Sequence, residues 1–281
     1  MFGFINKKIK NIDKPRILVF ANQKGGVGKT TTAINLGSAI AEKGYKVLII
    51  DLDPQGNAST GLGIYKEARE FSSYDILVDK MPINNVKLQT IVKNLYLVPS
   101  TLDLLGIEAT LASDENRSFK LKDAIQDMLL DTENTENKYN YILIDCPPSL
   151  NLLTINALAA SDAVIVPLQC EFYALEGLGQ LLETVDHVKK TLNANLAIHG
   201  IVLTMFDERN NLSGQVEKDV REYMKDKVYE TVIPRNVRVS EAPSYGKPVL
   251  AYDYKCSGSK AYIKLASEVL NRDKNTTINP I

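Results

Sequence analysis

The segment KGGVGKTT, residues 24–31, constrains the fold of this chain more than any other feature of its sequence. It follows a short β-rich run that starts at Arg16, and it precedes TTAINLGSAIAEKG, whose apolar residues have helical spacing. Glycines let a backbone curl until successive N–H groups converge on an anion, and the N-terminus of the next helix adds its dipole. The motif therefore predicts a phosphate-binding loop in which Lys29 holds the β- and γ-phosphates and the Thr30 hydroxyl binds Mg²⁺.

The loop departs from the general phosphate-loop pattern at one position. That pattern has a glycine six residues before the lysine, and here Gln23 occupies that place. A second lysine, Lys24, stands directly before the double glycine instead. A glycine-rich turn without a ligand is the alternative interpretation. The adjoining strand, the helix and the GKT sequence favour a phosphate site.

Acidic residues end two further predicted strands. Asp51 closes VLIID, and Asp53 follows it by two residues, so both side chains can face one site at the carboxyl end of the sheet. One could orient an attacking water and the other could support a metal shell, whereas a simple loop cap is the alternative. Asp145 closes YILID in the Walker B arrangement, which places a carboxylate near Mg²⁺. Pro147 and Pro148 stiffen the loop that follows.

Apolar runs alternate with helical stretches along the chain. Strands are predicted at 17–21, 47–51, 95–99, 141–145, 163–167, 198–204 and 228–234. Helices are predicted after the glycine loop, where Gly44 closes the first one, and near 101–113, 119–131, 149–160, 173–193, 212–226 and 259–271. Crossover helices return a chain in the same direction, so this order predicts one doubly wound, mostly parallel α/β sheet. We expect a basic flexible tail at 1–15, the folded domain at 16–271 and a polar tail at 272–281.

Charge and composition exclude several classes of protein. The net charge is -1, which excludes nucleic-acid binding through bulk charge but leaves room for a local patch. Residues 235–264 hold six basic and two acidic side chains, whereas residues 100–137 hold nine acids and three bases. No apolar run approaches the ~20 residues of a membrane span, and the first residues lack an export signal. Three cysteines without a CxxC spacing favour a reducing cytoplasm.

Five segments together resemble one known family. In order they are KGGVGKTTT, DLDPQGNAS with GLG, DCPPSL, LTMFD and IPRNVRVSEAPSYGKP. This set is similar to the ParA/Soj chromosome- and plasmid-partitioning ATPases, which have a deviant Walker A motif, across about residues 16–270. The resemblance implies an ATPase that needs ATP and Mg²⁺ and forms an ATP-dependent homodimer. It also implies DNA binding without sequence preference, and hydrolysis stimulated by a ParB-like centromere-binding protein.

The resemblance also assigns roles to individual residues. Lys24 would reach the phosphates of the partner subunit, and Asp53 matches the hydrolytic aspartate. The implied catalytic residues are Lys24, Lys29 and Asp53. The implied metal site consists of Thr30, Asp53 and Asp145. The implied nucleotide contacts are Lys24, Gly25, Gly26, Val27, Gly28, Lys29, Thr30 and Thr31, with Pro234, Asn236 and Val237 beside the adenine. The implied DNA contacts are Arg209, Arg238 and Lys247.

The family expectation extends to location and cargo. The cargo is a chromosome, a plasmid or another body, and the protein is expected in the cytoplasm at the nucleoid. Only about 15 residues precede the first predicted strand, so we expect no helix-turn-helix domain and no operator binding. Cys146 follows the Walker B aspartate as a small buried residue.

Three rival functions fit the sequence less well than partitioning. A MinD-like membrane-switching ATPase needs an amphipathic C-terminal helix, and residues after Arg272 lack leucine and aromatic side chains, so stable membrane association is not expected. A redox protein like nitrogenase reductase needs a cluster held by cysteines, whereas Cys146 and Cys170 lie in partition-type segments. An interaction module with an inactive nucleotide site disagrees with the intact lysine, threonine and aspartate set.

Overall fold

One sheet of seven strands forms the centre of the structure, a computed structural model that describes residues 14–131 and 138–278. The strand order is β3-β4-β2-β5-β1-β6-β7, and every neighbouring pair is parallel except β3 with β4. The strands are β1 (Arg16–Phe20), β2 (Val47–Asp51), β3 (Leu88–Gln89), β4 (Leu95–Val98), β5 (Tyr141–Asp145), β6 (Ala163–Gln169) and β7 (Ala197–Thr204). The predicted doubly wound, mostly parallel sheet is confirmed.

Strands lie on both sides of β1 in the sheet. The chain passes first to β2 and β4 on one side, and later to β6 and β7 on the other. β5 inserts between β1 and β2, with Asp145 opposite both Phe20 and Asp51. Open α/β sheets bind ligands at the carboxyl ends of strands where the winding reverses, which here is the region around β1 and β5.

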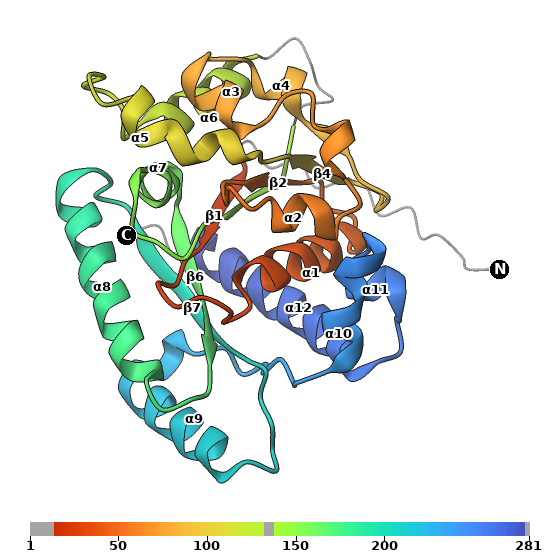
Figure 1. Cartoon of the computed structure of the whole chain (residues 1–281). Coiled ribbons are helices and arrows are strands. Elements are labelled where there is room, and N and C mark those ends of the chain that lie inside the picture. The colour runs from red at the N-terminus through yellow and green to blue at the C-terminus, as the bar shows by residue number, and fades with distance from the viewer. Residues whose placement is uncertain (1–13, 132–137, 279–281) are drawn as a thin grey trace.

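Helices cover both faces of the sheet (Figure 1). One face packs against α1 (Lys29–Glu42), α2 (Asn57–Gly61), α10 (Val237–Glu241), α11 (Val249–Tyr252) and α12 (Ser257–Ile278). The other face packs against α3 (Ser73–Val78), α4 (Ile83–Val86), α5 (Ile107–Thr110), α6 (Lys120–Leu130), α7 (Leu152–Ala160), α8 (Ala174–Thr191) and α9 (Asn211–Met224). None of the helices in the described ranges is long and apolar enough to cross a membrane.

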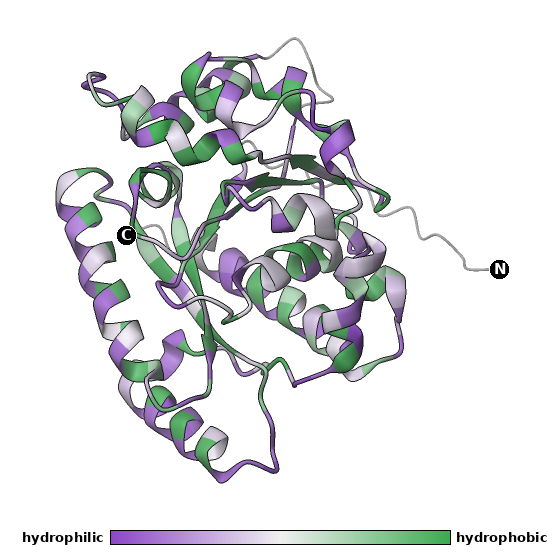
Figure 2. Cartoon of the chain, in the orientation of Figure 1, coloured by the Kyte–Doolittle hydropathy of each residue, from purple (hydrophilic) through white to green (hydrophobic). Residues whose placement is uncertain are grey.

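The strands are apolar along their whole length because both of their faces are covered. In β2, Leu48 and Ile50 enter one core while Val47 and Ile49 enter the other, and all four are fully buried. Figure 2 shows the central strands as predominantly hydrophobic, with hydrophilic residues on the outer faces of helices such as α8 and α9. Burial on two faces explains why these runs do not alternate with polar residues.

The strand predicted at 228–234 is wrong. Only isolated bridges join this segment to the sheet, from Ile201 to Val228 and from Phe206 to Pro234. Between them, the N–H groups of Glu230 and Thr231 donate to the Glu268 carboxylate of α12, at 2.8 and 3.1 Å. That carboxylate takes the Thr231 N–H, which a continuous ladder would have used, so the segment follows β7 only at its two ends.

The polar tail predicted at 272–281 begins too early, because α12 continues to Ile278. The Asp273 carboxylate accepts hydrogen bonds from Tyr141 Oη at 2.8 Å and from Arg16 Nε at 3.1 Å, and it lies 3.1 Å from His199 Nε2. These partners come from β1, β5 and β7. Polar contacts rather than an apolar stripe therefore hold this part of the helix against the sheet. Residues 1–13 of the predicted basic tail lie outside the described residues.

Other element boundaries differ locally from the prediction. The helix predicted at 101–113 consists of a 3₁₀ turn at Leu102–Gly106 and the short α5, with Gly106 at their junction. α7 begins at Leu152 rather than 149, where the Asn151 side chain accepts a hydrogen bond from the Thr154 N–H. The short helices α2, α3, α4, α10 and α11 were not predicted. Each spans six residues or fewer, which is too short for a clear periodic pattern.

Candidate functional site

The glycine loop after β1 adopts a conformation that its glycines permit. Gly26 and Gly28 have φ values of +75° and +87°, a region that side chains with a Cβ rarely adopt. The Thr204 hydroxyl, at the end of β7, donates to the Val27 carbonyl at 2.8 Å. α1 begins directly after Gly28, so the loop brings the N-terminus of a buried helix to the carboxyl edge of the sheet.

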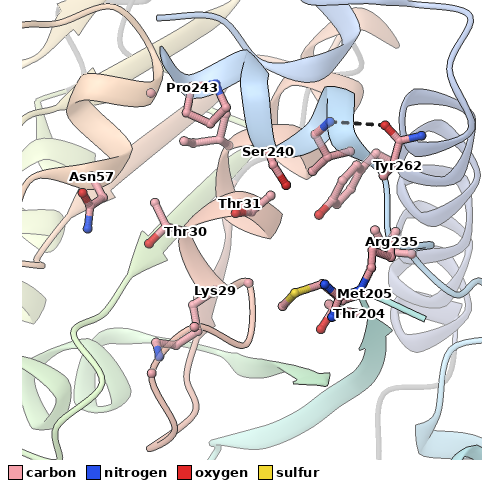
Figure 3. A pocket seen from close by; sticks show the side chains of 18 of the residues that line it. Lys29, Thr30, Thr31, Asn57, Thr204, Met205, Arg235, Ser240, Pro243 and Tyr262 are labelled. Carbon is pink, nitrogen blue, oxygen red and sulfur yellow. Dashed lines mark hydrogen bonds between the residues drawn. The ribbon is translucent and has the colours of Figure 1, made fainter. Parts of the chain in front are cut away.

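A cavity of about 750 Å³ lies between this loop, α2 and the segment after β7. Figure 3 shows side chains of α1, of Thr204 and Met205, and of the C-terminal segment arranged around one space. Of the predicted site residues, those that line it are Gly25, Gly26, Gly28, Lys29, Thr30, Thr31, Asp53, Pro234 and Asn236. The volume and the mixture of loop, hydroxyl and charged groups suit a nucleotide-sized ligand.

Lys29 is a buried cation that lines the cavity. Its side chain is largely buried, and its Nζ donates to the Lys24 carbonyl at 3.0 Å. Burial lowers the pKa of Lys29, while the nearby Asp145, Cys146 and Asp53 act in the opposite direction. The loop thus holds an ammonium group between the acidic strand ends and the space above the glycines.

The two acids of the DLD segment have different environments. The carboxylate of Asp51 accepts hydrogen bonds from the Asp53 N–H at 3.1 Å and from Ser59, through N–H at 2.9 Å and Oγ at 2.7 Å. Burial raises the pKa of Asp51 to about 6, although these hydrogen bonds act to lower it. The expectation that both side chains face one site is wrong. Asp51 is enclosed by its own loop, and only Asp53 lines the cavity.

Asp145 is a fully buried carboxylate, and neither of its oxygens has a hydrogen-bond partner among the described residues. Burial raises its pKa well above the usual range and the neighbouring Asp51 adds to this, while Thr30 and Lys29 act in the opposite direction. A buried acceptor without a donor is costly unless a cation completes its surroundings. The Thr30 hydroxyl and the Asp53 carboxylate both act on the pKa of Asp145, and the three groups offer only oxygen ligands, the type that Mg²⁺ prefers.

Three predicted nucleotide contacts do not line the cavity. Val27 is buried beneath the loop and Val237 is 70% exposed, outside the space. The Lys24 ammonium lies 2.8 Å from Glu171 Oε1, and this pair is partly exposed to solvent. Lys24 therefore points away from the cavity of its own chain.

The three predicted DNA contacts are exposed, but two of them have acidic neighbours. The Arg209 guanidinium donates twice to Asp207, with both distances at 2.9 Å, and its side chain is 89% exposed. Arg238 pairs with Glu241 at 3.0 Å and lies 3.6 Å from Asp253. Lys247 is exposed and has no ion pair within the described ranges.

Sequence reasoning missed a large part of the cavity wall. Met205 has a φ of +50°, a strained value for a residue with a Cβ, and this bends the chain into the site directly after β7. The missed residues are Ile34, Gln55, Asn57, Thr60, Gly61, Pro148, Thr204, Met205, Ile233, Arg235, Val239, Ser240, Pro243, Ser244 and Tyr262. Most of them lie inside the quoted motif segments, and that membership was the available signal.

Comparison with known proteins agrees with this geometry. The sequence profile of the AAA domain family matches residues 15–198. Chromosome partitioning protein ParA of Caulobacter vibrioides is 56% identical over 260 residues, covering 92% of this chain and 96% of that protein. Sporulation initiation inhibitor protein Soj of Bacillus subtilis is 53% identical over 254 residues, with 90% and 98% covered.

Solved structures lead to the same class. Cobyrinic acid a,c-diamide synthase from Mycobacterium smegmatis, with bound ADP and magnesium, aligns with a TM-score of 0.80 at 35% identity, covering 93% of this chain and 96% of that one. The doubly wound sheet and the glycine loop after its first strand define a P-loop ATPase with a deviant Walker A motif. With relatives above 50% identity over nine-tenths of its length, the chain belongs to the ParA/Soj family of partitioning ATPases.

The separate environments of Asp51 and Asp53 lead to a stability prediction. Asp51→Ala removes the acceptor of three donors in a buried region and should lower the free energy of unfolding by about 3 kcal/mol, since one orphaned buried donor costs ~1–3 kcal/mol. Asp53→Ala should change it by less than ~1 kcal/mol. Urea unfolding followed by circular dichroism measures both. Equal stability of Asp51→Ala and the wild type would contradict the structural role.

Proposed function

We propose that the chain binds and hydrolyses ATP with Mg²⁺ and that its ATP-bound dimer binds DNA without sequence preference. In this proposal a ParB-like centromere-binding protein stimulates hydrolysis and releases the DNA, which drives segregation of a chromosome, a plasmid or another body at the nucleoid. The observation that carries the ATPase proposal is the orphaned carboxylate of Asp145 beside Lys29 and Thr30, below a nucleotide-sized cavity. The partitioning proposal rests on the names of the relatives.

Different residues around the cavity would bind the phosphates, the Mg²⁺ ion and the base. Loop N–H groups and the N-terminus of α1 face the phosphates, and Lys29 places its charge beside the β- and γ-phosphates. Thr30, Asp53 and Asp145 would hold Mg²⁺, which when bound neutralises charge on the phosphate oxygens. Pro234 and Asn236 line the cavity on the side that would receive the base, and Val237 follows them in the chain.

In this proposal Asp53 orients the attacking water. It lies at the cavity wall, where its carboxylate can accept a hydrogen bond from a water in line with the γ-phosphate. As the water oxygen bonds to the γ-phosphorus, its proton passes to the Asp53 carboxylate, and the bond to the bridging oxygen breaks so that ADP leaves with that electron pair. A positioned base typically contributes ~10²–10⁴-fold to the rate.

Lys24 supports a role between subunits. Its ammonium is outside its own cavity and is held by one partly exposed ion pair, with Glu171. Exposed pairs contribute only ~0–1 kcal/mol, so the lysine can exchange this partner for phosphate oxygens at little cost. A Cβ built on Gly25 meets no atom within 4 Å, which leaves open space at the loop for a second subunit to approach.

Lys24→Ala should therefore bind ATP with near wild-type affinity and fail to dimerise. Gly25→Val should also fail to dimerise, because its side chain meets no atom of the monomer and would obstruct the close approach of a partner. Lys189→Ala, which removes an exposed lysine on α8, is the matched control. Light scattering with a slowly hydrolysed ATP analogue gives the oligomeric state, and a normal dimer for either loop variant would refute the role in trans.

The proposed DNA surface rests on charge rather than on shape. The chain is near neutral, but residues 235–264 carry an excess of basic side chains, and Arg238 and Lys247 lie within them. Arg209 stands on the loop before α9 and is almost fully exposed. Arginine grips phosphate oxygens bidentately and stays charged, and dimerisation doubles the number of such contacts. The acids that now pair with Arg209 and Arg238 would be exchanged for phosphates.

The double variant Arg209→Glu, Arg238→Glu should dimerise with ATP and lose DNA binding. The control Lys122→Glu, Lys189→Glu changes the net charge equally, on α6 and α8. Filter binding of double-stranded DNA across a salt series measures the effect, since each lost contact lowers the log–log salt slope by ~0.9. Wild-type affinity of the arginine variant at matched salt would show that the surface is elsewhere.

A further inference from the structure

Three buried serines hold the backbone that carries Asp53. Ser59, Ser73 and Ser100 come from different segments, and each is at most 1% exposed. Ser59 donates to the Asp51 carboxylate, and Ser73 Oγ donates to the Asp51 carbonyl at 2.7 Å. The DLD segment is therefore fixed from outside as well as by its own strand.

Ser100 makes the contact nearest to the cavity. It lies just after β4, and its Oγ donates to the Asp53 carbonyl at 2.5 Å. Its N–H donates to Ser59 Oγ at 3.1 Å, so the same residue joins both ends of the loop after β2. The Asp53 carbonyl also accepts from the Gly56 N–H at 2.8 Å, and the Asp53 carboxylate accepts from the Gln55 N–H at 3.0 Å.

Arg69 closes this arrangement from the solvent side. Its guanidinium donates to the Ser100 carbonyl at 3.0 Å, to the Gly56 carbonyl at 3.3 Å and to Thr60 Oγ1 at 2.8 Å. Gly56 has a φ of +62°, and a Cβ built there would lie 2.3 Å from Arg69 Nη1 and 3.1 Å from the Ser100 carbonyl oxygen. Arg69 and Ser100 therefore pack directly on the turn that follows Asp53.

We propose that Ser100 is a positioning residue for ATP hydrolysis, with Arg69 holding Ser100 and the Gly56 turn in place. This inference rests on the proposed role of Asp53. A carboxylate orients water only while its own peptide is fixed, and the Ser100 hydroxyl is the side-chain donor to that peptide's carbonyl. Ser100 touches neither the cavity nor the phosphates, so its effect reaches the reaction only through Asp53.

The geometry separates catalysis from ATP binding. Lys29, Thr30 and the glycine loop belong to β1 and α1, whereas the serines hold the segment after β2. Removing the Ser100 hydroxyl leaves the Asp53 carbonyl with its Gly56 hydrogen bond, so the fold persists while the aspartate gains freedom. A displacement of 1 Å can cost ~10²-fold in rate, and with one hydrogen bond retained we expect kcat to fall on the order of 10-fold.

The test is single-turnover hydrolysis of Mg-ATP by Ser100→Ala, with and without double-stranded DNA, beside equilibrium binding of a fluorescent ATP analogue. We expect the rate to fall on the order of 10-fold with unchanged affinity. Ser161→Ala is the matched control, because Ser161 is also buried and donates only to a backbone carbonyl, of Ala157 at 2.7 Å. Arg69→Lys is a second variant, at a partly exposed side chain. It should also lower the hydrolysis rate and leave the affinity for the ATP analogue unchanged.

Two results would overturn the inference. One is a wild-type rate for Ser100→Ala. The other is a rate and affinity that fall together, or that fall equally in Ser161→Ala, which would indicate a general structural effect. The wild type and Asp53→Ala give the upper and lower limits of the hydrolysis rate in this assay. If Asp53→Ala hydrolyses ATP like the wild type, the proposed role of Asp53 fails, and the positioning role of Ser100 fails with it. If Asp53→Ala is inactive while Ser100→Ala is fully active, only the positioning role is refuted.

Discussion

The hydrogen-bonded register of β5 between β1 and β2 determines where the site can be. Asp145, the last residue of β5, lies opposite Phe20 on one side and Asp51 on the other. The glycine loop, the DLD segment and the Walker B aspartate therefore start from the same level of the sheet. A shift of β5 by one residue would turn Asp145 to the other face of the sheet and remove it from Lys29 and Thr30.

This register places two buried carboxylates side by side, and the chain compensates their charges differently. Two fully buried carboxylates, Asp51 and Asp145, lie beside each other, and burial raises the pKa of both. Asp51 is compensated by donors from its own loop. Asp145 has no such donors among the described residues, and only Lys29 and Thr30 offset its burial. The region proposed to receive the phosphates and Mg²⁺ thus contains a buried carboxylate that the chain itself compensates only through Lys29 and Thr30.

The sequence predicts the parts of the site that depend on local order. Gly28, Lys29 and Thr30 follow a strand and begin a helix, so their placement is readable from neighbouring residues. The segment at 228–234 was misread because Glu268, which takes two of its N–H groups, is about forty positions away in the chain. A β-rich composition cannot reveal a competing acceptor on a distant helix.

The sequence does not predict the different environments of the Asp51 and Asp53 carboxylates, for a similar reason. Alternation along an extended segment places both side chains on one side, but the chain turns at Asp53–Gly56, and Ser59 comes back to enclose the Asp51 carboxylate. Ser73 and Ser100 are equally invisible in the sequence, because a serine near a strand end or helix start resembles an ordinary cap. Their role in the fold appears only when three separate segments meet.

We propose that the cavity beside Lys29 holds the phosphates of Mg-ATP. Equilibrium titration of a fluorescent ATP analogue with magnesium, into the wild type, Lys29→Ala and Asp53→Ala, tests it most directly. We expect Lys29→Ala to lose measurable binding, since Lys29 places its charge against the phosphates, whereas Asp53→Ala should keep measurable binding because Thr30 and Asp145 remain to hold Mg²⁺. Wild-type affinity in Lys29→Ala would contradict the assignment of the site.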